Sequence, residues 1–354
     1  MPKQDKSNLY EGQGQTGKTM KPYKALVDTM NPQHYLARPA LQHAVNVALT
    51  LGQPLLVTGK PGTGKTELAS SIAYEFNKLP LFPFHVKSTS VAQDLFYQYD
   101  AIRRFQDSHD QNKSIDPKDY IDFKALGLAI LLTLPPKDAN PYLPEKYQNI
   151  GPIRSVILLD EIDKAPRDLP NDILVEIEKM EFSVKELDQD PFVANKDYRP
   201  IVVITSNSEK NLPDAFLRRC VYYHIPFPTS DELKTIIQRR FQDDPVIARH
   251  LKPEFIDIVN NHFSDIQKLD LKKEPATAEL LAWFSVIHCV DLNIDPVLKA
   301  LSQPDPDITH VIEQFKATYA VLVKTERDLH TIHNFVEQDL LKKGHVYQLM
   351  TMMG

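Results

Sequence analysis

The sequence predicts an α/β fold, in which a parallel sheet lies between helices, followed by a smaller α-helical domain. Three observations predict it. Short apolar runs alternate with helical stretches up to about residue 225, a glycine-rich loop joins one of those runs to a helix, and the pattern is nearly all helical after Pro226 and Pro228. At 354 residues, the chain is long enough for two domains.

Helical spacing of apolar residues first occurs from Ala37 to Leu51 and ends at Gly52. It returns from Glu67 to Phe76. Short apolar runs of strand length occur at Pro54–Thr58, Leu81–Val86, Ser155–Leu159, Ile201–Thr205 and Val221–Ile225. Runs of this kind, alternating with helices, predict buried strands of a parallel sheet with helices on both faces.

Beyond residue 228 we expect helices at Asp231–Phe241, Pro253–Phe263, Thr277–Val290 and Asp307–Val336. The two prolines and the capping pair Thr229 and Ser230 mark the boundary. We therefore divide the chain into a flexible polar leader (1–32), an α/β domain (33–228) and a helical domain (229–354).

Composition excludes several classes of protein. The formal net charge of −6 gives no overall cationic field, which disfavours generic binding to nucleic acid or anionic membranes. Cys220 and Cys289 are far apart, which argues against a disulfide scaffold or zinc site and favours a reducing cytoplasm. The start of the chain lacks the apolar core of a secretory signal. The apolar stretch Ala125–Leu134 is too short to span a membrane and is expected to be a buried helix.

The pattern G-x-x-x-x-G-K-[ST] occurs twice, as Gly12–Thr19 and as Gly59–Thr66. A phosphate-binding loop needs a strand before it and a helix after it, so that the N–H groups of the helix start face the phosphates. The first match lies in a polar segment and is soon followed by Pro22. The second follows the apolar run Pro54–Thr58 and precedes a helical stretch, so it is the one we predict to bind nucleotide.

Each residue type in the second loop has a chemical reason to be there. Its glycines allow the backbone amides to turn inward around phosphates, Lys65 brings a positive charge to the β- and γ-oxygens, and the Thr66 hydroxyl is suited to Mg²⁺. The predicted nucleotide-binding set is Gly59, Pro61, Gly62, Thr63, Gly64, Lys65, Thr66, Glu67 and Asp160, with Thr66 and Asp160 as the Mg²⁺ ligands.

Two carboxylates end the apolar run Ser155–Leu159. Asp160 is placed to hold Mg²⁺ through its water shell, and Glu161 to polarise an attacking water. A Glu directly after the Asp favours hydrolysis of the nucleotide over transfer of phosphate to a metabolite. The alternative is that both are surface charges after a strand.

Polar residues also follow the later runs. Asn207, after Ile201–Thr205, is placed to orient the water or to contact the γ-phosphate, although asparagine is also a common turn residue. Arg218 and Arg219 follow a short turn-helix and are suited to reach the γ-phosphate of a neighbouring subunit. A solvated basic pair without function is the alternative.

Together, Gly59–Thr66, Leu158–Glu161, Thr205–Asn207 and Leu217–Arg219 resemble the AAA+ ATPases, and within them the MoxR family. The resemblance covers about residues 35 to 345. It implies a five-stranded α/β nucleotide domain with a helical lid, a hexameric ring that binds ATP and Mg²⁺, and chaperone-like remodelling of a partner protein, often one with a von Willebrand A domain.

The resemblance also assigns roles by position. It makes Asp160 and Glu161 the Walker B pair, Asn207 the sensor-1 residue and Arg219 the arginine finger, with Arg218 second. The stretch where such proteins often carry a sensor-2 arginine, Glu274–Leu281, has none. Lys272 or Lys273 could substitute, or coupling of the lid to the γ-phosphate is weak.

Inserted segments are candidates for contacting a partner. They contain Phe96, Tyr97 and Tyr99 and the hairpin-like stretch Phe182–Tyr198, which the family would place at the ring surface or pore. Packing of these aromatics in a local core is the alternative.

Three functions fit the sequence. The first is an ATP-driven remodelling ring, the second an ATP-gated switch or scaffold with slow turnover, and the third a motor subunit acting on DNA, which the acidic composition disfavours. The phosphate-binding loop does not contact the base of the nucleotide, so the sequence fits GTP as well as ATP. The client and the number of subunits are not encoded in any of these motifs.

Overall fold

The computed structural model describes residues 31–109, 115–208, 212–244, 247–248, 251–289, 294–303 and 312–353. These include every predicted site residue. The first P-loop match, Gly12–Thr19, and the predicted leader up to residue 30 lie outside them. The described chain forms two compact units, one of residues 35–227 and one of residues 31–34 with 228–353.

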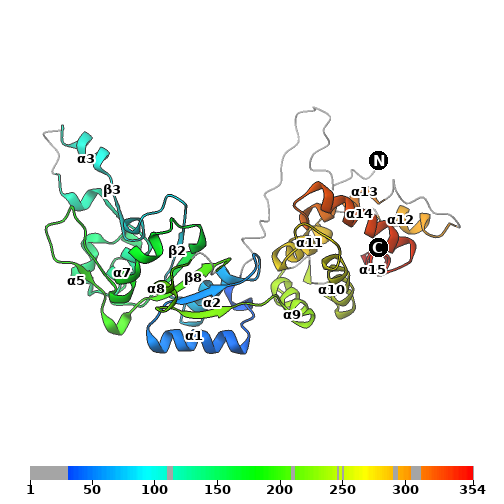
Figure 1. Cartoon of the computed structure of the whole chain (residues 1–354), viewed down its shortest axis with the longest axis horizontal. Helices are drawn as coiled ribbons and strands as arrows, with labels where there is room; N and C mark the ends of the chain where they lie inside the picture. Colours follow the sequence, from blue (N-terminus) through cyan, green and yellow to red (C-terminus); the bar gives the residue numbers. More distant parts are fainter. Residues whose placement is uncertain are drawn as a thin grey trace. The chain divides into compact units, whose positions relative to one another are not determined.

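The first unit contains a five-stranded sheet in the order β2-β5-β8-β1-β9, part of which is visible in Figure 1. Its strands are β1 (Leu55–Thr58), β2 (Leu81–His85), β5 (Val156–Asp160), β8 (Ile201–Ser206) and β9 (Val221–His224). Every neighbouring pair is parallel. The predicted fold class is confirmed, and each predicted apolar run forms a strand.

Helices and smaller strands surround this sheet. The helices are α1 (Pro39–Leu51), α2 (Lys65–Glu75), α3 (Ala101–Asp107), α4 (Ala125–Leu131), α5 (Pro136–Ala139), α6 (Leu169–Asp172), α7 (Leu174–Lys179) and α8 (Asp214–Leu217). Two antiparallel pairs are formed by β3 (Tyr97–Tyr99) with β4 (Ile121–Phe123), and by β6 (Glu181–Phe182) with β7 (Phe192–Val193).

Alternate residues of the central strands serve two separate cores. Leu55 and Val57 of β1 belong to the core that includes α1 and α2, whereas Leu56 belongs to the core that includes α4, α6 and α7. All three side chains are at most 1% exposed. A strand that is buried on both faces carries an unbroken apolar run, which explains why these strands could be recognised in the sequence.

The inserted aromatics lie mostly in the core. Phe96 and Tyr97 are 4% and 2% exposed, and Phe182 and Phe192 stack on each other with ring centroids 5.2 Å apart. The alternative of local core packing therefore describes these four residues, and their candidacy as partner contacts is wrong. The expected buried helix within Ala125–Leu134 is confirmed as α4.

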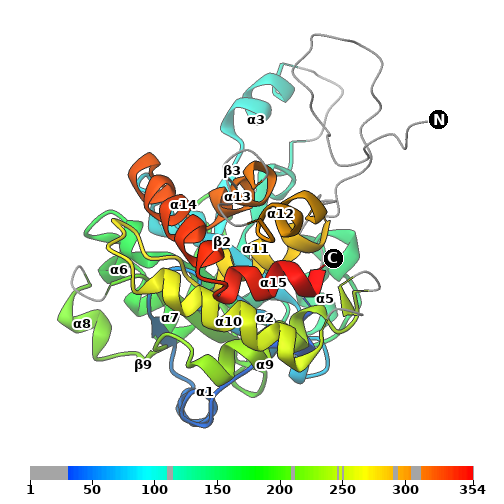
Figure 2. The ribbon, with the colours of Figure 1, turned by 90° about the vertical axis from the view of Figure 1, so that its right-hand side faces the viewer.

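The second unit is helical. It contains α9 (Ser230–Phe241), α10 (Pro253–Gln267), α11 (Thr277–Cys289), α12 (Asp295–Ala300), α13 (Glu313–Thr318), α14 (Glu326–Leu341) and α15 (His345–Met353). Figure 2 shows α15 running beside α10, which it contacts. Thr229 caps α9 by accepting a hydrogen bond from the Glu232 N–H, as its sequence indicated.

One predicted helix, Asp307–Val336, is wrong as a single element. In its described part, α13 ends at Thr318, a 3-10 turn follows at Tyr319–Val321, and α14 begins after Thr325. Tyr319 is fully buried, and the Thr325 side chain accepts a hydrogen bond from the Asp328 N–H, so a new helix is capped where the pattern suggested continuity. Among the described helices, none is long and apolar enough to cross a membrane.

Candidate active site at the carboxyl edge of the sheet

The loop between β1 and α2 closes around Lys65. Its Nζ atom donates hydrogen bonds to the carbonyl oxygens of Gly59, at 2.8 Å, and Lys60, at 3.0 Å. Burial lowers the pKa of the Lys65 ammonium, and the nearby carboxylates, Asp163 first among them, act in the opposite direction. The ammonium group is therefore held in the loop by backbone oxygens.

Two glycines of the loop occupy positions where a side chain would not fit. A Cβ atom on Gly59 would lie 2.7 Å from the carbonyl oxygen of Ile225. Gly64, which precedes α2, has φ +85°, and a Cβ atom there would lie 3.3 Å from the Tyr35 ring. Pro61, Gly62 and Thr63 lie between these glycines, and Thr63 Oγ1 donates to the Lys60 carbonyl at 2.8 Å. The predicted Glu67 lies in the first turn of α2.

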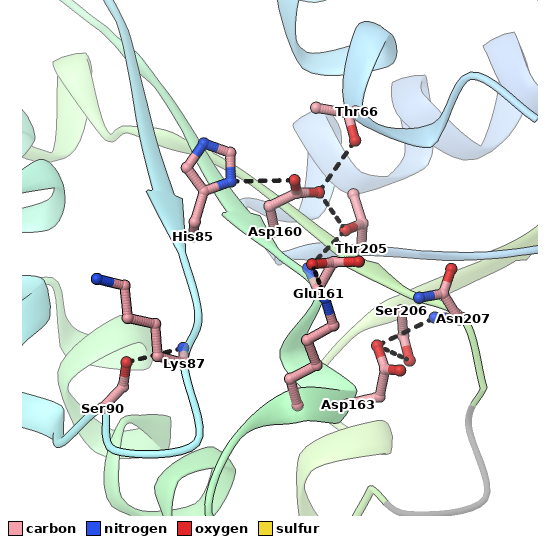
Figure 3. Close-up of polar contacts among 11 residues, drawn as sticks. Thr66, His85, Lys87, Ser90, Asp160, Glu161, Asp163, Thr205, Ser206 and Asn207 are labelled. Carbon is pink, nitrogen blue, oxygen red and sulfur yellow. Dashed lines mark hydrogen bonds and ion pairs between the residues drawn. The ribbon is translucent and has the colours of Figure 1, made fainter. Parts of the chain in front are cut away.

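The Asp160 carboxylate, at the end of β5, accepts hydrogen bonds from two hydroxyl groups. Thr66 Oγ1 of α2 and Thr205 Oγ1 of β8 both donate to Asp160 Oδ1, at 3.0 and 2.6 Å (Figure 3). His85 Nδ1, at the end of β2, lies 3.2 Å from Asp160 Oδ2. Asp160 itself is only 8% exposed. Three elements thus meet at one buried carboxylate.

Glu161 has an unusual backbone conformation. Its φ is +61°, in the left-handed region that non-glycine residues seldom adopt and that often occurs at functional sites. Its N–H donates to Thr205 Oγ1 at 2.9 Å, which helps to hold the turn. Its carboxylate pairs with the Lys164 ammonium. The side chain is partly exposed at the same edge as the glycine-rich loop.

Asp163 connects the turn after β5 to the end of β8. Its Oδ1 atom accepts hydrogen bonds from Ser206 Oγ at 3.2 Å and from the Asn207 N–H at 3.1 Å (Figure 3). Ser206 is buried, whereas Asn207 is exposed. Asp163 therefore fixes the backbone from which the Asn207 side chain extends.

Arg218 and Arg219 lie at the other edge of the sheet, that is, at the amino ends of the strands. They precede β9, which runs parallel to β1 with Val221 opposite Leu55, whereas the glycine-rich loop follows β1 at Thr58. A four-residue strand spans about 13 Å. Arg219 donates to Glu178 Oε2 and to the Ala215 carbonyl. The exposed Arg218 side chain has no hydrogen bond or ion pair within the described residues.

Three contributing residues were not singled out from the sequence. Thr205 lies inside a recognised motif but had been assigned no role, and Asp163 comes two residues after the recognised Glu161. His85 ends a different strand, and its Cα is the register partner of the Asp160 Cα. A signal for His85 did exist, because polar residues at the carboxyl ends of neighbouring parallel strands meet at one edge.

The residues of this edge fit a phosphate chain with a divalent cation. The start of α2 offers N–H groups at a helix N-terminus, Lys65 adds a positive charge, and glycines leave room for close approach. Thr66 Oγ1 and Asp160 are adjacent oxygen donors of the kind that Mg²⁺ uses beside phosphates. The site therefore defines a nucleotide-binding α/β protein of the P-loop class.

Comparison with known proteins assigns the class more closely. Residues 54–220 match the AAA domain of the dynein-related subfamily. The chain is 24% identical over 259 residues to a Lon protease of Xanthomonas oryzae pv. oryzae, a match that covers 70% of this chain and 26% of that protein. The chain thus spans about a quarter of the length of this relative.

Two solved structures of Thermotoga maritima RuvB are also similar. A mutant gives a TM-score of 0.44 at 15% identity and covers 93% of this chain and 81% of its own. A chain described as the RuvB Holliday junction branch migration motor gives 0.40 at 15%, covering 87% and 75%. Both TM-scores are below 0.5, so the assignment rests on the family match and the site. The chain carries an AAA+ ATPase domain, which is an ATP-hydrolysing module.

Proposed function

We propose that this chain binds Mg-ATP at Gly59–Thr66 and hydrolyses it where two subunits of a ring meet, using the energy to remodel a partner protein. The observation that carries the proposal is the separation of the two halves of the site. The phosphate loop, Asp160 and Glu161 lie at one edge of the sheet, and the arginines lie at the other. An arginine that serves catalysis from there must reach the site of another subunit.

The residues of the carboxyl edge divide the chemistry between them. Lys65 and the N–H groups at the start of α2 hold the β- and γ-phosphates, and Thr66 and Asp160 hold Mg²⁺, which supplies charge neutralisation on the phosphate oxygens when bound. Glu161 orients and polarises the attacking water. Asn207, positioned through Asp163, fixes that water or the γ-phosphate.

The finer proposals follow the resemblance to the MoxR family. They are a hexameric ring, a chaperone-like action, a client that carries a von Willebrand A domain and a cytoplasmic location. The net charge of −6 supports a protein client over nucleic acid. Arg219 is the proposed arginine finger and Arg218 the second candidate.

Turnover and nucleotide binding, measured separately, test the proposal. Glu161→Gln should retain binding of a fluorescent ATP analogue and lower kcat by roughly 100- to 10,000-fold, the range for loss of a general base. Arg219→Ala should likewise retain binding and lose turnover. Normal kcat in Glu161→Gln would contradict the assigned chemistry.

A slow ATP-gated switch is the second candidate, and one observation favours it. The Glu161 carboxylate is paired with Lys164, so in this conformation it is not free to act on a water. A switch would bind ATP and release phosphate only when a partner breaks this pair. Tight retention of ATP by the purified protein, with turnover raised by a partner, would support the switch over the constitutive motor.

A further inference from the structure

The Arg219 side chain is held along one side by its own subunit. Its Nε atom donates to Glu178 Oε2 at 3.1 Å, and its Nη1 atom donates to the Ala215 carbonyl at 3.0 Å. Glu178 belongs to α7 and Ala215 to α8. Within the described residues Nη2 has no partner, so the guanidinium is oriented while one of its nitrogens stays available.

Glu178 is itself fixed by its backbone. Arg199 Nη2 donates to the carbonyl oxygens of Ile177 and Glu178, at 3.0 and 2.9 Å, and so satisfies the end of α7. Arg199 Nε donates to the Gly52 carbonyl at 2.9 Å, at the C-cap of α1. Burial lowers the pKa of the Arg199 guanidinium. The carboxylate of Glu178 therefore extends from a rigid point of the fold.

The ion pair between Glu178 and Arg219 contributes little to stability. The Arg219 and Glu178 side chains are 46% and 63% exposed, and pairs with such exposure are strongly screened by water. A long arginine side chain loses considerable rotamer entropy when it is fixed at a ligand. A pair that fixes the side chain in advance lowers that loss, so the pair affects orientation more than folding.

We propose that Glu178 is a positioning residue for the trans-acting arginine, holding Arg219 in the orientation in which it reaches the γ-phosphate in the neighbouring subunit. This inference rests on the proposed function, because it requires the shared site. Glu178 would then be a determinant of ATP turnover. It belongs to α7 and is remote from the phosphate loop, both in sequence and because it lies at the other edge of the sheet. Glu178 serves the site of the neighbour and has no role in the site of its own subunit.

Mixed subunits test this directly in the full-length chain. Glu161→Gln subunits, the donors, cannot hydrolyse ATP in their own site but supply Arg219 to a neighbour. Arg219→Ala subunits, the recipients, have an intact site of their own but supply no arginine. Their mixture should recover ATP turnover that neither variant shows alone. When Glu178→Ala is added to the donor, recovery should fall about five- to tenfold, because the arginine is no longer oriented.

When Glu178→Ala is instead added to the Arg219→Ala recipient, recovery should be unchanged. A merely structural role of Glu178 would not produce this asymmetry. Glu178→Gln in the donor should restore most of the recovery, because its amide oxygen still accepts from Arg219 Nε. Glu181→Ala is the matched control, since Glu181 pairs with Lys179 at 3.2 Å and not with Arg219.

The outcomes separate the two proposals. Full recovery with the Glu178→Ala donor, or an equal loss from donor and recipient, overturns the role of Glu178 and leaves the shared site intact. Absence of recovery in the simple mixture, with mixed assembly verified by mass, overturns both. Melting temperatures equal to that of the natural protein establish that Glu178→Ala has not acted through unfolding.

Discussion

The two units of this chain bury polar side chains in different ways. At the carboxyl edge of the sheet, the buried Asp160 carboxylate accepts a hydrogen bond from Thr66, and the Lys65 ammonium donates to carbonyl groups of its own loop. A bound ligand can take the place of these partners. In the helical unit, His262 bonds to Tyr319 at 2.8 Å, enclosed on all sides. Buried polar groups beside an open edge indicate a binding site, whereas enclosed ones indicate a structural role.

The largest effect on nucleotide binding is expected from removing the charge at the open edge. Lys65→Ala should weaken binding of an ATP analogue by roughly 10- to 100-fold, because a hydrogen bond to a charged group contributes about 1.5–3 kcal/mol. The fold should remain, since Lys65 has only backbone oxygens of its own loop as hydrogen-bond partners. Titration with a fluorescent analogue checks the binding. Unchanged affinity would place the nucleotide elsewhere.

The buried pair of His262 and Tyr319 in the helical unit predicts that the stability of the protein depends on pH. Burial first, and the charge on nearby His345 second, lower the pKa of His262 to about 3, while the Asp265 carboxylate acts in the opposite direction. Below pH 6.5 the unfolded chain binds a proton at this residue that the folded chain does not. The free energy of unfolding should therefore decrease as the pH falls from 6.5 towards 3, by about 1 to 3 kcal/mol between pH 6.5 and 4.5.

Urea unfolding monitored through Trp283 can measure this change, because Trp283 lies 5.6 Å from the His262 ring, centroid to centroid. His262→Gln, which keeps a partner for the Tyr319 hydroxyl but does not titrate here, is the control. Its stability is expected to be lower overall and flatter between pH 6.5 and 4.5. An equal slope in both proteins would show that His262 is not the group responsible.

A smaller effect should come from Asp163, whose hydrogen bonds link the turn after β5 to the end of β8. Asp163→Ala removes the hydrogen bonds from the Ser206 hydroxyl and from the Asn207 N–H and should lower kcat about tenfold, with little change in KM. Asp163→Asn keeps an oxygen acceptor and should recover most of the activity. Steady-state kinetics of the two variants decide between positioning of Asn207 and a general electrostatic effect, which the neutral Asn would not restore.

The smallest expected change concerns the ion pair of Glu161. Lys164→Ala frees the Glu161 carboxylate and should change kcat by only about two- to fivefold, because an exposed pair contributes roughly 0 to 1 kcal/mol. An increase in kcat would favour the switch, in which the pair restrains Glu161. A decrease would mean that Lys164 helps to orient the carboxylate for hydrolysis.

Much of the fold and of the phosphate edge could be predicted because local patterns encode them. Strands such as Val156–Asp160 are buried on both faces and are therefore apolar up to their last residue. The role of Glu178 depends on which distant segments meet, and no spacing in the sequence records that. His85 ends a predicted strand, but its contact with Asp160 follows only once β2 is known to lie beside β5. The break before Thr325 was missed because the helical period continues across it.

The central claim is that the active site is shared between subunits, and the specific ATPase activity measured against protein concentration tests it most directly. We predict that activity per subunit rises with concentration as the oligomer forms, and that Glu161→Gln and Arg219→Ala each abolish it while ATP binding persists. Activity per subunit that is independent of concentration down to the monomeric state, or that survives in Arg219→Ala, would contradict the shared site.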